Sequence, residues 1–422
     1  EKGHEKEWNS SDPNKERTHC EVDFDLCAAS IMAKSTAAKL RDTLAIAGFK
    51  SMSSTVFNAA LNKLNEVAET FYKLDRELTL AKIKLAYKGM APEFEIDTAY
   101  HTRINSWTSV TTALCARTKL VAETSLEITG EGVCSQQLEK KGMGKVLPAV
   151  IERYGGCSSV TTDACGSLRK QVADIVKPLV QKGECEQLLD IWHQQKGIYS
   201  KFVAYISAKW GSVPRRTGED GKPISNSMAD IQENAAQKKE MLKLARWMRG
   251  HFTYTIDHAD GSKSKATEIW KNAAAHLSGD HTKCSELNSD ADCSESEVRL
   301  RTPKMIQVMT NFLNEKDLID DFEMYRTDRS TSWIESFNNT LAAFADKRLF
   351  FNVKALRLRH ILAVLSWNEM RGRQLLERRP TKVGPRNSRH QNRTERNRYA
   401  APAHAWRQNL MGQFRIERPI KK

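Results

Sequence analysis

The feature that most limits the fold is a run of three short strand-like segments, followed by helices and strands in alternation. The three segments are rich in valine, isoleucine, threonine, leucine and aromatic residues, and polar breaks separate them: Phe94–Thr98, Ser109–Cys115 and Leu120–Ile128. This pattern predicts β-strands. Helical spacing then covers 135–154, a fourth strand is expected over 159–162, a helix to about residue 180, and a fifth strand over Glu186–Ile191. That order predicts a mixed α/β fold.

Helical patterns lie on both sides of this region. In Thr55–Tyr87, apolar residues recur at three- and four-residue spacing, as in an amphipathic helix, and Ser53 and Ser54 stand where an N-cap belongs. Two late helices are predicted over Trp333–Ala345 and Val353–Leu376. We expect an α/β, ribonuclease-H-like mixed sheet, interrupted by a large all-helical insertion and preceded by a small helical domain. The expected parts are a polar linker (1–22), an N-terminal helical domain (23–90), the first part of the sheet domain (91–200), the insertion (201–322), the final helices (323–376) and a basic C-terminal tail (377–422).

The charge balance favours a polyanionic partner. Lys and Arg outnumber Asp and Glu by 66 to 52, for a net charge of +14, and nucleic acid is the commonest partner of such proteins. The segment 378–398 concentrates this charge, and we expect phosphate contacts from Arg386, Arg389, Arg393 and Arg396. The nine scattered cysteines indicate a reducing compartment, and the apolar runs are too short for a membrane partner. The chain starts at Glu1 without methionine, so we expect a fragment or a processed chain.

Three acids stand where metal-dependent phosphoryl transfer would need them. Such chemistry uses carboxylates that converge on two cations, for which magnesium or manganese is suited. A ribonuclease-H-like sheet has one acid in its first strand, one at the end of its fourth and one on a late helix. Asp97, Asp163 and Glu335 occupy these places. Glu95 is an alternative to Asp97, and we expect it to point to the opposite face of the strand.

Four passages resemble eukaryotic cut-and-paste transposases of the Mutator-like and Kolobok-like group and their domesticated relatives. The first is the Asp97 strand with Arg103 after it, and the second runs from Val160–Asp163 through Ser167–Lys170. The third, Leu189–His193 with Lys196–Ile198, is similar to the family's motif of Asp or Cys, two residues, then His. The fourth is Ser332–Asn339, with Lys347, Arg348, Arg357–Arg359 and Ser366–Glu369. In the family, a helical insertion separates the second and third acids, and here 172 residues (335 − 163) separate them.

The resemblance implies a nuclear DDE-type transposase that cleaves transposon ends and joins them to target DNA as a homodimer or higher homo-oligomer. Asp97, Asp163 and Glu335 would hold magnesium, and His193, Trp333, Lys347 and Arg348 would contact DNA. His193 has two other interpretations, as a metal ligand or as a hydrogen-bonded core residue. Two other functions stay open: a domesticated, inactive DNA-binding protein, and a two-metal nuclease without strand transfer.

A candidate zinc site lies in the insertion. His276, His281, Cys284 and Cys293 offer two imidazoles and two thiolates at short spacing, a donor set that suits tetrahedral zinc, and the family often has a similar pattern here. In a variant of this site, His193 or Cys185 would join the ligands.

Overall fold

The computed structural model describes residues 21–49, 53–101, 106–129, 135–163, 166–211, 216–217, 223–224, 227–284, 299–373, 375–380, 395–399 and 404–417. The fold is mixed α/β, and its main sheet has the strand order β3-β2-β1-β4-β5. β1 (Glu93–Tyr100), β2 (Thr108–Cys115) and β3 (Val121–Ile128) pair antiparallel. β4 (Ser159–Thr162) and β5 (Glu186–Leu189) pair parallel. The five predicted strands are confirmed, although β5 ends two residues earlier than expected.

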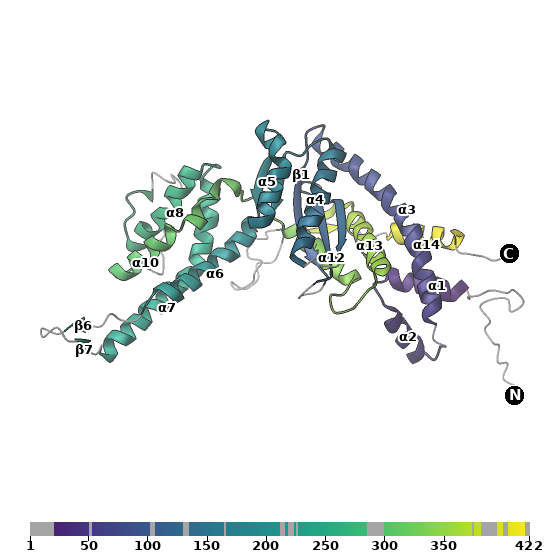
Figure 1. Cartoon of the computed structure of the whole chain (residues 1–422), viewed down its shortest axis with the longest axis horizontal. Coiled ribbons are helices and arrows are strands. Elements are labelled where there is room, and N and C mark those ends of the chain that lie inside the picture. Colours follow the sequence, from purple (N-terminus) through teal and green to yellow (C-terminus); the bar gives the residue numbers. More distant parts are fainter. Residues whose placement is uncertain are drawn as a thin grey trace, which may run out of the picture. The chain divides into compact units, whose positions relative to one another are not determined.

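The chain divides into two compact units, which are described separately. Unit 1 comprises Glu1–Ser158 and Trp333–Lys422, and unit 2 comprises Ser159–Ser332. This division differs from the domains drawn from the sequence, because the first helices and the last ones share unit 1. Figure 1 labels most of the helices of both units.

In its described residues, unit 1 contains seven helices, the strands β1–β3 and a hairpin of β8 (Leu375–Pro380) and β9 (Glu395–Tyr399). The helices are α1 (Glu21–Met32), α2 (Ala37–Ile46), α3 (Ser54–Tyr87), α4 (Ser135–Tyr154), α12 (Ser332–Phe344), α13 (Val353–Arg371) and α14 (Ala405–Glu417). The Ser53 side chain accepts a hydrogen bond from the Val56 backbone N–H, so the predicted N-cap of α3 is confirmed.

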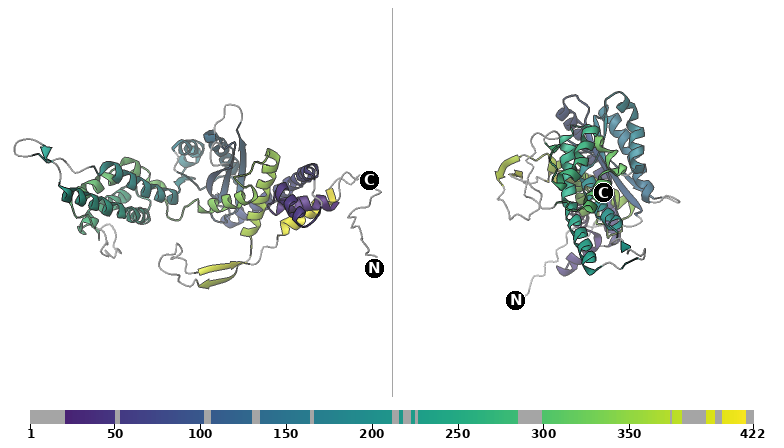
Figure 2. Two further views of the ribbon diagram at one scale, coloured as in Figure 1. Left: turned by 90° about the horizontal axis from the view of Figure 1, so that it is seen from below. Right: turned by 90° about the vertical axis from the view of Figure 1, so that its left-hand side faces the viewer.

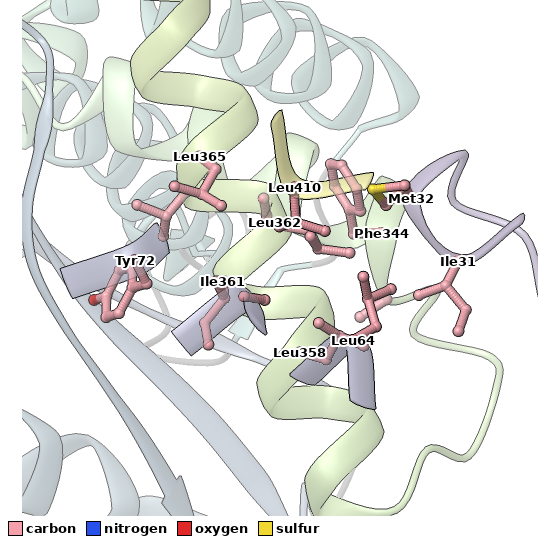
Figure 3. Packing of buried hydrophobic residues seen from close by; sticks show 14 of the residues in the cluster. Ile31, Met32, Leu64, Tyr72, Phe344, Leu358, Ile361, Leu362, Leu365 and Leu410 are labelled. Carbon is pink, nitrogen blue, oxygen red and sulfur yellow. The ribbon is translucent and has the colours of Figure 1, made fainter. Parts of the chain in front are cut away.

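The core of unit 1 forms where α3 packs on α13. The apolar face predicted for α3 supplies Leu64 and Tyr72, and α13 supplies Leu358, Ile361 and Leu362, all of them buried (Figure 3). α13 is buried on nearly every side, since most of its residues from Ala355 to Asn368 are inaccessible to solvent. The helix is in contact with α1, α3, α14 and the strand β3.

The C-terminal region contains a helix that the sequence analysis did not predict. α14 lies beside α1 and α3 (Figure 2). Phe414 stacks on Phe24 with ring centroids 5.5 Å apart, and Arg415 bonds to Asp25 at 2.8 Å. The segment 404–417 is thus part of the unit 1 core, and a purely mobile basic tail is an incomplete description of 377–422.

A buried arginine links three segments of unit 1. Arg359 on α13 is 2% exposed, and its guanidinium donates to the Phe344 carbonyl at 2.7 Å and to the Ser35 carbonyl. Burial lowers the pKa of Arg359 to about 10, so the group stays charged at neutral pH. The Phe344 carbonyl is at the end of α12, where helix carbonyls have no partner within the helix, and Ser35 lies between α1 and α2.

Unit 2 is mostly helical, as predicted for the insertion. Its helices are α5 (Gly166–Gln181), α6 (Ile191–Lys209), α7 (Met228–His258), α8 (Lys263–Ser278), α10 (Pro303–Leu313), α11 (Lys316–Ile319) and the short 3-10 helix η1 (Phe322–Met324). The two-residue strands β6 (Arg216–Thr217) and β7 (Pro223–Ile224) also pair there. Unit 2 has its own hydrophobic core, which contains Phe202, Phe252, Trp270 and Phe312. None of the described helices of the protein has the length and apolar content needed to cross a bilayer.

Truncation of one core leucine should measure how strongly α3 holds unit 1 together. Leu64 is fully buried, so Leu64→Ala should lower the free energy of unfolding by about 2–5 kcal/mol. The matched control is Leu78→Ala on the same helix, where the side chain is 60% exposed, and it should change stability little. Chemical denaturation followed by circular dichroism measures both, and equal losses would contradict this packing.

The buried histidine of α13 should make stability depend on pH. Burial, with Arg357 adding to it, lowers the pKa of His360 from 6.5 to about 3. Between these two values the unfolded chain binds a proton that the folded protein does not, so stability is complete above pH 6.5 and falls as the pH drops toward 3. At pH 5 the loss should be about 2 kcal/mol. Chemical denaturation of His360→Leu between pH 6.5 and pH 3 should not show this loss in the free energy of unfolding. The same pH dependence in the variant as in the unchanged protein would contradict the prediction.

Candidate carboxylate and metal sites

Asp97 lies in the middle of β1, after two apolar residues of the strand. Phe94 and Ile96 are fully buried, whereas the Asp97 side chain is half-buried. Its backbone is in register with Thr112 of β2. An aspartate is disfavoured inside a strand unless its side chain has a specific role, so the pairing holds a carboxylate at a fixed place on the sheet.

α12 brings Glu335 to the helix face that meets β1. The buried positions Ile334, Phe337 and Leu341 fix the orientation of this helix against the core. Asn338 donates a hydrogen bond from Nδ2 to Asp97 Oδ2 at 2.9 Å. Glu335 is one turn before Asn338, and residues three apart share a helix face. The structure therefore places Glu335 on the side of α12 that contacts Asp97.

Glu95 is the other acid of β1, and it has a structural partner. Its side chain is 2% exposed and accepts a 2.8 Å hydrogen bond from Lys119. The expectation that Glu95 points away from the Asp97 face is wrong, because residues two apart in a strand point to the same face. The two acids differ in burial and in their partners. Glu95 is buried and bonded to Lys119, whereas Asp97 is half-buried and bonded to Asn338 of α12.

Trp333 lies beside Glu335 with cations on its ring. It is 38% exposed, and the Arg371 guanidinium lies between the rings of Trp333 and Trp367, at 4.7 and 4.3 Å from their centroids. Trp367 is buried and donates to the Lys119 carbonyl at 2.8 Å. Trp333 is thus held in place on the helix that bears Glu335, with part of its ring open to solvent.

The other predicted DNA contacts lie in the loop after α12 and near the C-terminus. Lys347 and Arg348 are exposed in the loop 345–352. Arg386, Arg389 and Arg393 lie outside the described residues, and Arg396 belongs to β9, whose backbone alone is described.

In unit 2, Asp163 and His193 form one cluster with Asp190. Asp163 directly follows β4, and its Oδ1 lies 3.0 Å from His193 Nδ1. His193 is in the first turn of α6, not at the end of a strand as expected, because Asp190 caps this helix and accepts from the Trp192 N–H at 2.9 Å. Asp190 is fully buried, contacts His193, and accepts from Thr331 Oγ1 at 2.6 Å.

The charged groups of this cluster stabilise one another's ionised forms. Hydrogen bonds to Asp163 and Asp190 raise the pKa of His193 to about 10, against the effect of its burial. Burial alone would raise the pKa of Asp190, but the bonds from His193, Thr331 and the Trp192 backbone hold it below its usual value. His193 is therefore an imidazolium between two carboxylates at neutral pH.

Sequence reasoning missed Asp190 and Thr331 as members of this cluster. The signal for Asp190 was present in the motif of Asp, two residues, then His, since that spacing spans one helical turn. Thr331 gave no such signal, because its contact with Asp190 joins residues 141 positions apart. The candidate ligand atoms of Asp163, Asp190 and His193 lie within 4.8 Å of one another.

The candidate zinc ligands also converge. His276 Nδ1 lies 3.4 Å from Cys284 Sγ, and His281 Nδ1 lies 3.8 Å from the same sulfur. Burial, aided by His281, lowers the pKa of His276, which favours the neutral imidazole that binds metals. Cys293 lies outside the described residues. Two imidazoles and a thiolate fit three of the four positions of a tetrahedral zinc ion.

The variant site with His193 or Cys185 is not what the structure shows. Across the described ranges, the group of His276, His281 and Cys284 is separate from the group that contains His193. Cys185 is buried just before β5 and belongs to neither group.

No protein-family model matches this sequence, and a search of curated proteins finds no match of significance.

Loss of a ligand should remove zinc from unit 2. We expect the purified protein to bind one cobalt ion as a zinc substitute, with the visible absorption bands of tetrahedral thiolate coordination. Cys284→Ser should weaken or abolish these bands, whereas Cys185→Ala, a matched control at a buried cysteine of the same unit, should leave them unchanged. Bands that are lost in both variants would instead support the variant site, in which Cys185 joins the ligands.

Proposed function

We propose that this protein is a DDE-type DNA transposase with a ribonuclease-H-like catalytic fold, which cleaves and joins DNA strands with magnesium or manganese. The strand order, with three antiparallel strands followed by a parallel pair, supports that fold. The helical unit 2, which provides most of the chain between Asp163 and Glu335, supports the family resemblance.

The observation that carries the proposal is the hydrogen bond between Asn338 and Asp97. It joins the first strand to the late helix that bears Glu335, at a separation of 241 residues. Chain closure over such a length costs conformational entropy, and a contact that pairs two acid-bearing elements in this way suits a carboxylate site. By holding Asp97 Oδ2, Asn338 restrains the rotation of that carboxylate.

Asp97 and Glu335 would hold the metal ions, and Asp163 is proposed as the third ligand on the sequence alone. When bound, two such ions activate a water or a 3′-hydroxyl and stabilise the departing oxygen. The residues of the chain orient the carboxylates: Asn338 does so for Asp97, and the protonated His193 does so for Asp163 through a 3.0 Å contact. Such supporting bonds keep a ligand in the geometry that the metal requires.

The proposal assigns DNA contacts to exposed basic and aromatic side chains. Lys347 and Arg348 would neutralise backbone phosphates, which gives affinity that falls as salt rises. Trp333, next to Glu335, would position the DNA near the acids. The proposal includes a homo-oligomer, because two transposon ends have to be paired. It also includes a nuclear location, as the family resemblance implies.

The decisive experiment is metal-dependent nicking of a supercoiled plasmid. The protein should nick the plasmid with magnesium or manganese, and Asp97→Asn, Asp163→Ala and Glu335→Gln should each abolish nicking because each removes a metal ligand. Asn338→Ala should reduce the rate by roughly 10- to 100-fold. The matched control is Glu152→Gln, an exposed acid of α4, which should cleave normally.

The outcomes separate the proposed function from its two alternatives. DNA binding without nicking, equal in all variants, would indicate an inactive DNA-binding protein. Nicking without joined products would indicate a nuclease that lacks strand transfer. Nicking that survives Asp163→Ala and disappears in Asp97→Asn would remove Asp163 from the ligand set.

A further inference from the structure

The loop 345–352 of unit 1 exposes an aromatic side chain that a second aromatic supports from one side. Phe350 is 80% exposed, an unusual position for a large apolar ring. Its ring stacks on that of Trp107, which precedes β2, with centroids 5.3 Å apart and an interplanar angle of 27°. Trp107 covers one face of Phe350, and most of the remaining surface of the phenylalanine is open to solvent.

This loop is anchored at several points. The His101 ring, which is 8% exposed, donates from Nε2 to the Leu349 carbonyl at 3.1 Å. Phe351 is buried beside His101, with ring centroids 5.8 Å apart. Asn352 then caps α13 by accepting from the Ala355 N–H. Phe350 is therefore presented in a defined position, so little conformational entropy would be lost when a partner binds it.

Cations stand next to the aromatic pair. Lys347 is exposed, and the Arg348 side chain is 92% exposed. The one acid of this loop, Asp346, lies 3.6 Å from Arg348, so the loop keeps a net positive charge. Aromatic rings with lysine and arginine beside them are the usual means of binding single-stranded nucleic acid, because bases stack on the rings while cations hold the phosphates.

We propose that Phe350 and Trp107 form a stacking platform for an unpaired DNA base, with Lys347 and Arg348 on the flanking phosphates. This inference rests on the proposed function and adds to it a contact away from the acids. A base inside a duplex has both faces covered by its neighbours, so the exposed ring can stack only on a base that is unpaired or has left the helix. The charge beside the rings favours DNA over an uncharged apolar partner.

The platform lies on the same unit as Asp97 and Glu335. His101, which anchors the loop, directly follows β1, the strand that bears Asp97. The platform would therefore contact a nucleotide of the same DNA that the acids act on.

The test compares binding of two labelled duplexes by fluorescence anisotropy, one fully paired and one with a single unpaired thymine. The protein should bind the second more tightly, and Phe350→Ala should lose that preference, with affinity for the unpaired DNA reduced roughly fivefold or more. The matched control is Leu85→Ala, which removes an equally exposed side chain from α3 and should bind both duplexes normally. Arg348→Ala should weaken both duplexes alike and reduce the salt dependence.

Permanganate oxidation of the unpaired thymine gives a second readout. Stacking on Phe350 should protect this base in the complex, and Phe350→Ala should leave it reactive. Equal affinities and equal protection for the protein and Phe350→Ala would overturn the platform while the proposed function stands, and so would an equal loss on both duplexes. Failure of the protein to bind either duplex would overturn both the proposed function and the platform.

Discussion

The hydrogen bond from Asn338 to Asp97 depends on a helix that returns to the first strand after 241 residues. That return is possible because α12 and α13 supply much of the core of unit 1, where α13 is buried on nearly every side against α3 and the sheet. Burial of this apolar surface outweighs the entropy of closing so long a loop, since that entropy grows only slowly with length. The candidate carboxylate site and the loop that carries Phe350 are both consequences of this packing.

The intervening chain folds around a core of its own. Unit 2 buries aromatic residues of α6, α7, α8 and α10 together in a hydrophobic cluster separate from that of unit 1. Its polar clusters also form within the unit: the candidate zinc ligands lie on α8 and the loop after it, and Asp163, Asp190, His193 and Thr331 contact one another. A long insertion is tolerated when it satisfies its own apolar and polar groups in this way.

Much of the secondary structure could be predicted, because hydrophobic periodicity reports which face of an element is buried. β4 and α4 have the predicted limits, and α3 begins at its predicted cap. Hydrophobic periodicity gave a wrong boundary where a helix cap ends a strand early. Glu186–Ile191 has the composition of one strand, but Asp190 caps α6 and ends the strand at Leu189. The helix α14 was not predicted, because the basic residues before it suggested a tail without structure. Its contacts with α1 and α3 bury its apolar residues.

The sequence by itself determined most of the strands and helices of the sheet region, the excess of positive charge, and the presence of Asp97 in a strand, Asp163 just after one and Glu335 on a late helix. It could do so because these properties depend on residues close together in the chain. Only the tertiary structure decided which side chains meet: Asn338 with Asp97, Glu95 with Lys119, Thr331 with Asp190, and Phe350 with Trp107. Each of these pairs joins segments far apart in sequence, and their contact follows from the packing of whole helices and strands, which no local pattern records.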